Sequence, residues 1–294
     1  MIILLIGICI IILLIVILIR VNKENMQFEK LSQQSINNKK CGLLFLIYDE
    51  INHEKLWYDY LSQIDNQKYS IYIHYKNDKE LKFFQKSKIN NSIDTKWGDI
   101  SLVKAQNVLL GEALKDKNNT HFIFLSNSCI PLKKFNNIYD NIQLDKSYFN
   151  IAPDGIFPRY NNIKKYTDSR NIMKASQWSI LCRKHANILY NDSEIYYKWF
   201  ENVPIPDEGA YITYLNHMKC QNELILTNNS ANNATTFTNW SDMNYKYVGN
   251  ESPKYYKNIS NEELDYLVNN SKCFFGRKFH KECDLSYLYK LLSI

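Results

Sequence analysis

Apolar and polar residues follow two patterns along this chain, one typical of buried strands and one typical of helices. Three short apolar or aromatic runs have the length of strands, at 42–48, 69–75 and 121–126. Between them, apolar residues recur at helical spacing after His53 and across 101–114, with Ser101 as a candidate N-cap. This alternation predicts an α/β domain with a largely parallel sheet flanked by helices.

The second half of the body has a weaker pattern, with a polar, Asn-rich loop from Asn228 to about Ser260. Short strands are expected at 178–182 and 273–279. Helical spacing predicts helices at 183–190, 207–217, 261–268 and 285–292.

An uncharged apolar run covers residues 2–19 and is closed by Arg20. It has about the length that crosses a bilayer and lacks a small-residue cleavage site, so residues 1–20 are predicted to be a transmembrane signal-anchor. A polar, flexible stem is expected at 21–40. The remaining body, at 41–294, is long enough for one large domain or two small ones, and one domain is expected. The basic residues follow the apolar run, which by the positive-inside rule alone favours a cytoplasmic body.

Charge and cysteine content narrow the class of protein. The net charge of +6 is spread along the chain without a block of like charges, which argues against a nucleic-acid partner. Cys9 lies in the apolar run, and the even number of cysteines in the body predicts disulfides formed in an oxidising lumen. No CxxC pair occurs, which gives a zinc site little support.

An α/β sheet of this kind binds ligands at the carboxyl ends of its strands, so a nucleotide site is expected there. The chain has neither a P-loop motif nor a GxGxxG motif, and its 8 glycines are few. Phosphates are therefore expected to contact side chains. No two aspartates lie two positions apart, and the nearest mixed form, Glu282-Cys283-Asp284, comes after the predicted sheet.

Seven short motifs occur in an order that resembles one enzyme family. They are "WGDISLV" from Trp97, "FIFLSNSCIPL", "SQWSILCR", "PDE", "NWS", "SPK" and "FGRKF". This order is similar to that of the core-2/I-branching glycosyltransferases, which include the branching β-1,6-N-acetylglucosaminyltransferases and the peptide O-xylosyltransferases. The plant-type members look closest, and the resemblance covers residues 42–292.

The resemblance implies a GT-A type fold and inverting transfer of a sugar from a UDP-sugar to a glycan or protein hydroxyl without a divalent metal. N-acetylglucosamine is the expected sugar, with xylose and glucuronic acid as alternatives. It also implies a type II membrane protein with its body in the Golgi lumen, against the flanking charges. The alternative function is an inactive, membrane-anchored carbohydrate-binding protein on the same fold.

Two adjacent carboxylates, Asp207 and Glu208, follow a proline-stiffened loop. From the sequence pattern alone, they are expected to cap the predicted helix at 207–217, because acids are common at helix starts. The family resemblance instead matches Glu208 to a catalytic glutamate, the base that removes the proton of the acceptor hydroxyl. Asp207 is then expected beside the acceptor, where it could also cap the helix.

Basic side chains are expected to meet the charge of the leaving diphosphate. Lys278 matches the family position of a phosphate-binding lysine, with Arg277 beside it and Lys254 as a weaker candidate. The alternative for each is a solvated surface charge. Ser126 is expected in the floor of the donor site, together with Trp97 and Gly98, although a packing role is equally compatible with the pattern.

Trp240 and Trp178 are candidates for stacking on the apolar face of an acceptor sugar. Trp240 lies in the polar loop, whereas Trp178 lies in a predicted strand, where a core position is the more common outcome. Lys76 stands where relatives often carry an acid that reads the nucleotide base, and Asp78 could replace that acid after a shift.

Overall fold

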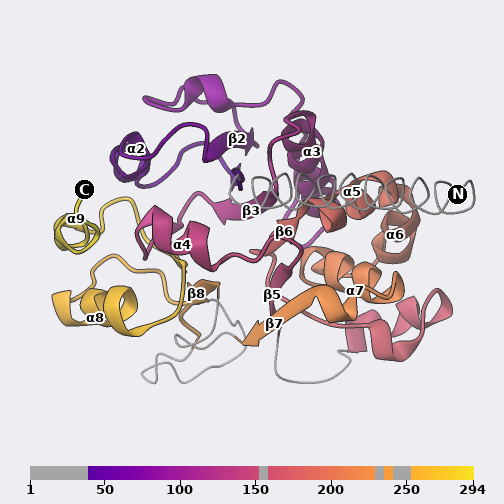
Figure 1. The fold of residues 1–294 in the computed structure, drawn as a ribbon. Helices are drawn as coiled ribbons and strands as arrows, with labels where there is room; N and C mark the ends of the chain where they lie inside the picture. The colour runs from indigo at the N-terminus through magenta and orange to yellow at the C-terminus, as the bar shows by residue number, and fades with distance from the viewer. Residues whose placement is uncertain (1–38, 152–157, 229–234, 241–252) are drawn as a thin grey trace, which may run out of the picture. The chain divides into compact units, whose positions relative to one another are not determined.

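Three apolar runs at the start of the body form the parallel half of a six-stranded sheet. The computed structural model describes residues 39–151, 158–228, 235–240 and 253–294 (Figure 1). In it, β1 (Cys41–Ile47) pairs in parallel with both β2 (Tyr69–Tyr75) and β3 (His121–Ser126). Leu46 is aligned with His74 on one side and with Ser126 on the other, so all three strands end at the same edge.

The sheet has the strand order β2-β1-β3-β6-β5-β7. β6 (Ile180–Cys182) is antiparallel to β3 and to β5 (Ser147–Ile151), whereas β7 (Leu224–Asn228) is parallel to β5. The prediction of an α/β domain with a mostly parallel sheet is confirmed. Residues Lys40–Ile294 form one compact unit.

Successive residues of β1 and β3 point into two separate apolar cores, as the period of two in a strand requires. Leu43 and Leu125 belong to one core, and Leu44 and Phe124 belong to the other. The first core is covered by α2 (Glu54–Ser62), α4 (Phe135–Asn141), α8 (Asn261–Asp265) and α9 (Ser286–Leu292) (Figure 1). The second is covered by α3 (Ser101–Lys115), α5 (Arg183–Asn191), α6 (Ser193–Phe200) and α7 (Ala210–His217).

A small second sheet has the order β4-β9-β8 and was not predicted as a unit. β9 (Phe275–Arg277) pairs with β4 (Ile130–Pro131) and β8 (Thr236–Thr238). The N–H of Phe279 donates to the carbonyl oxygen of Ser128 at 3.0 Å. These bonds hold the basic end of β9 beside the loop that follows β3.

Two predicted helix starts are wrong in detail. Ile100, not Ser101, is the N-cap of α3, and the Ser101 hydroxyl accepts a hydrogen bond from the N–H of Lys96 at 2.9 Å. The helix predicted from Asp207 begins at Ala210, after Gly209.

The prediction that the body cysteines are paired in disulfides is wrong for this structure. None of the six forms a disulfide with another described residue, and all are buried. An even count says nothing about proximity, and most of these sulfurs pack in the two apolar cores, where a free cysteine behaves as a small apolar residue. The thiol of Cys129, for example, accepts from the N–H of Ser126 at 3.2 Å.

Within the described ranges, no helix has both the length and the apolar character that a membrane span requires. The predicted signal-anchor at 1–20 and most of the predicted stem at 21–40 lie outside the described residues.

Candidate functional site

Glu208 closes a short 3₁₀ turn, η4 (Pro206–Glu208), that lies directly before α7. The turn begins with Pro206 after Ile205, whose φ of 53° is left-handed. The N-cap of α7 is Gly209, and it has no side-chain capping hydrogen bond. The interpretation of Asp207 and Glu208 as helix caps is therefore wrong, because the proline-led turn holds both residues ahead of the helix.

Two cations face the Glu208 carboxylate. The Lys174 ammonium lies 3.2 Å from Oε2, and Nη1 of Arg159 lies 3.7 Å from the same oxygen. The Glu208 side chain is 23% exposed, so part of it remains accessible to solvent. Lys174 and Arg159 were missed in the sequence, where each is one basic residue in a polar segment without a motif.

Asp207 points inward beside Glu208, and its Oδ1 atom is buried with no hydrogen-bond partner among the described residues. Burial, and then the charge of Glu208, raise the pKa of Asp207 to about 7. A cavity of ≈ 10 Å³, room for about one water, is lined by Asp207, Glu208, Gln177 and Ser179. Asp207 is thus half-buried, and it lines this cavity with its Oδ1 atom closed off from solvent.

Arg277 approaches this site from β9. Its guanidinium lies over the Trp178 indole, 4.8 Å from the ring centroid, and the charges of Glu208 and Asp207 act on it. Trp178 is only 7% exposed, so the core position expected from its strand is confirmed. The structure therefore brings Arg277 to the carboxylates and gives Trp178 the position of a platform under the guanidinium.

Lys278 follows Arg277 and is half-buried at the same end of β9. Burial, and then repulsion by Arg277, lower the pKa of the Lys278 ammonium. Lys254 contacts other residues. Its Nζ lies 3.8 Å from Oε2 of Glu263 and 4.6 Å from the centroid of the Tyr256 ring. Of the two lysines, Lys278 is the one adjacent to Arg277.

Ser126 ends β3, at the carboxyl edge where the donor site was expected. Its hydroxyl is buried and lies 3.2 Å from both the Ser128 hydroxyl and the Cys129 sulfur. These contacts close the turn after β3.

Lys76 leaves β2 at the same edge, and its ammonium lies 5.5 Å from the centroid of the exposed Tyr48 ring. Asp78, the candidate replacement for the missing acid, pairs with Lys88. The position is therefore basic and aromatic in this chain.

Two tryptophan side chains are exposed on loops. Trp240 follows β8 and is 38% exposed, in agreement with its predicted loop position. Trp97 is 83% exposed and precedes Gly98, whose carbonyl oxygen accepts from the N–H of Ile205 at 2.9 Å. That bond places the loop of Trp97 next to the turn that carries Glu208.

A comparison with models of protein families identifies the family of this chain. The family model described as "Core-2/I-Branching enzyme" matches residues 43–268, most of the body. The chain belongs to the core-2/I-branching enzyme family. The resemblance drawn from the seven motifs is thereby confirmed. The mixed α/β fold with its mostly parallel sheet agrees with the GT-A type architecture that the resemblance implied.

A glycosyltransferase from rice is similar to this chain in sequence. The chain is 31% identical over 182 residues to "Glycosyltransferase BC10" of Oryza sativa subsp. japonica, covering 58% of this chain and 46% of the relative. The chain thus spans about half the length of the curated relative that it matches.

The similarity of this chain to solved structures is weaker. A glycosyltransferase involved in the glycosylation of the major capsid of PBCV-1 has a TM-score of 0.41 at 11% identity, over 86% of this chain and 97% of that one. The galactosyltransferase LgtC, in complex with donor and acceptor sugar analogs, has a TM-score of 0.44 at 8% identity, over 80% and 86%. Likenesses at this level say nothing about individual site residues.

Proposed function

We propose that this core-2/I-branching family member is an inverting glycosyltransferase that moves a sugar from a UDP-sugar to a hydroxyl of a glycan or protein. N-acetylglucosamine is the expected sugar, with xylose and glucuronic acid next. The observation that carries the proposal is the position of Glu208, on a proline-led turn ahead of α7, partly exposed and not used as a cap.

Glu208 is the proposed base. Its carboxylate takes the proton of the acceptor hydroxyl while that oxygen attacks the anomeric carbon. The bond from the anomeric carbon to the diphosphate oxygen breaks on the opposite face, so the configuration inverts. The ion pairs with Lys174 and Arg159 support this role, because they hold the carboxylate at one place on the surface.

The leaving diphosphate is proposed to contact Lys278 and Arg277, whose charges compensate the negative charge that develops on it. Trp178 supports Arg277 from below, and Ser126 closes the floor of the donor edge. Lys254 is a weaker candidate because Glu263 already lies beside it. The absence of an Asp-x-Asp pair from the sequence supports transfer without a divalent metal.

The acceptor is proposed to lie on the exposed side of Glu208, because the cavity beneath the carboxylate has room for about one water. Trp240 remains a candidate platform for the acceptor sugar, and the exposed Trp97 joins it. Type II membrane anchoring and a lumenal body remain proposals that depend on residues 1–40.

The second candidate is a carbohydrate-binding protein without turnover. It is favoured by Lys76, which with Tyr48 replaces the acid expected at the nucleotide base. A screen of UDP-N-acetylglucosamine, UDP-xylose and UDP-glucuronic acid separates the two, with EDTA present and free UDP as the readout. We expect one donor to be consumed in EDTA. Consumption that requires added manganese would overturn metal independence, and no consumption of any donor would favour the binding protein.

A further inference from the structure

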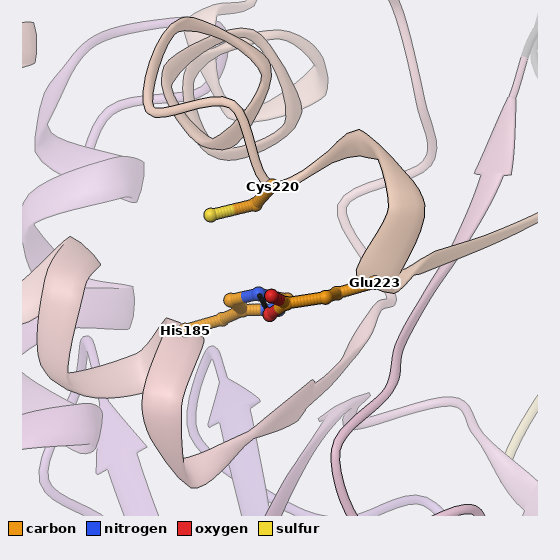
Figure 2. Close-up of side chains that lie close together, drawn as sticks. All are labelled: His185, Cys220 and Glu223. Carbon is orange, nitrogen blue, oxygen red and sulfur yellow. Dashed lines mark hydrogen bonds and ion pairs between the residues drawn. The ribbon is translucent and has the colours of Figure 1, made fainter.

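A second cluster of reactive side chains lies away from Glu208. His185 of α5, Cys220 after α7 and Glu223 of the turn η5 (Gln221–Glu223) place their ligand atoms within 4.8 Å of one another. Figure 2 shows the three side chains gathered at one place, with the thiol above the imidazole and the carboxylate. His185 and Cys220 are buried, and the Glu223 side chain is 33% exposed.

The three groups offer nitrogen, sulfur and oxygen, the set of ligand atoms that zinc takes from proteins. Nε2 of His185 lies 2.9 Å from Oε2 of Glu223. Two such ligands of a tetrahedral zinc lie about 3.3 Å apart, given bonds of about 2.0–2.1 Å. A small opening of this pair therefore suffices. The fourth ligand would be a water from solvent, to which the Glu223 side chain is partly exposed.

The surroundings orient each ligand. Nδ1 of His185 lies 2.7 Å from the Ser147 hydroxyl, so with a metal on Nε2 the Nδ1–H donates to that oxygen. The Lys184 ammonium donates to both carboxylate oxygens of Glu223, at 2.6 Å from Oε1 and 2.8 Å from Oε2, and Oε2 also faces Nε2 of His185. The Cys220 thiol has a weak contact of 3.7 Å to the carbonyl oxygen of Met218.

We propose that His185, Cys220 and Glu223 form a site for one zinc-class divalent ion. The ion would tie α5 to the segment that leaves α7, at the end of α7 opposite to the turn of Glu208. Its role is structural, and the Cys220 thiol releases its proton to solvent as the thiolate binds. Sequence spacing could not reveal this site, because it contains no CxxC pair.

The test uses the full-length chain, purified under reducing conditions and treated with a chelator. Equilibrium dialysis against zinc measures stoichiometry, and cobalt(II) replaces zinc as a spectroscopic probe. We expect one ion per chain and a thiolate-to-cobalt charge-transfer band. Cys220→Ser should abolish the band and Glu223→Gln should weaken zinc binding. Ser147→Ala should weaken it about 10–100-fold, as expected for a residue that orients a ligand.

Cys283→Ser is the matched control, since Cys283 is a buried thiol in the other core. Circular dichroism confirms folding of every variant, and the partly exposed Glu223→Gln keeps the test valid if a core variant unfolds. A chain that binds no zinc, or cobalt bands that persist in Cys220→Ser, would overturn the proposal and leave a hydrogen-bonded His185–Glu223–Lys184 network. None of these readouts requires sugar transfer, so the result of this test does not depend on whether the proposed function is correct.

Discussion

The backbone N–H of Ile205 donates to the carbonyl oxygen of Gly98 at 2.9 Å, and both residues have left-handed φ angles, 53° and 71°. The N–H of Glu208 in turn donates to the carbonyl oxygen of Ile205 at 3.3 Å. A left-handed conformation costs about 1–2 kcal/mol for a residue such as isoleucine. The loop before α3 therefore holds the turn that carries Glu208 in a conformation that it would not adopt alone.

Substitution of Gly98 tests this link. Gly98→Ala should destabilise the fold by about 1–2 kcal/mol, because alanine disfavours a positive φ, and should lower turnover by shifting the turn. The added Cβ meets only an ordinary contact, 3.6 Å from Cγ1 of Ile205, so strain rather than a clash is tested. Chemical denaturation measures the change. Gly42→Ala is the control, with a nearest contact of 3.5 Å and no positive φ. Equal stability and turnover in Gly98→Ala and wild type would argue against the link.

Asp207 should make stability depend on pH. Its pKa is raised to about 7 in the folded state, so the unfolded chain loses this proton first as pH rises. Stability is then lost between about pH 4 and pH 7 and is level above that range. Asp207→Asn should remove this loss and be more stable than wild type at alkaline pH, as measured by denaturant unfolding across pH.

Asp116 should have the opposite effect on the pH dependence of stability. Its hydrogen bond from Lys40 lowers its pKa, so its contribution is present above the ordinary carboxyl pKa and is lost as pH falls through the lowered value. Asp116→Asn should therefore destabilise the protein at neutral pH. If Asp207→Asn behaved in the same way as Asp116→Asn, the buried-acid account of Asp207 would fail.

Lys278 should contribute to donor binding. Lys278→Ala removes a charge-assisted contact worth roughly 1.5–3 kcal/mol, so the affinity for UDP should fall about ten-fold or more. Lys254→Ala should have a smaller effect, since Lys254 lies beside Glu263. Calorimetry with UDP measures both. Unchanged affinity in Lys278→Ala would show that Lys278 is a surface charge.

The exposed aromatic side chains should affect the acceptor rather than the donor. Trp97→Ala should raise the acceptor KM with little change in donor affinity, because an indole face presents an apolar surface to a sugar ring. Trp97→Phe should retain part of the effect. Tyr266→Ala is the control, as an exposed aromatic residue on η6 (Tyr266–Asn270). A donor KM that rises while the acceptor KM stays constant would place Trp97 on the donor side.

Four strands of the central sheet, β1, β2, β3 and β6, could be predicted because they read as apolar or aromatic runs, and β1 and β3 are buried on both faces. The strands β5 and β7 were not predicted. β3 has the predicted bounds, and β1 differs by one residue at each end. The small sheet could not be predicted, since strands as short as Ile130–Pro131 are too short to show a period. The start of α7 was misplaced because acids before a helix resemble caps, whereas the left-handed Ile205 redirects the chain.

The sequence led to Glu208, Arg277 and Lys278 through short motifs in a family order. Their neighbours Lys174 and Arg159 come from segments remote in the sequence and carry no motif, so only the folded chain brings them to Glu208. The lack of disulfides among the described cysteines and the His185–Cys220–Glu223 cluster were missed for the same reason, because residue counts and local spacing do not encode distance in space.

The most direct test is the transfer rate of Glu208→Gln beside its donor affinity. Glutamine keeps the size of the side chain and removes the base, so kcat should fall about 10²–10⁴-fold. UDP affinity measured by calorimetry should be nearly unchanged, because the base faces the acceptor. Glu201→Gln, an exposed glutamate after α6, is the matched control and should keep the wild-type rate. Folded Glu208→Gln that transfers sugar at the wild-type rate would contradict the account.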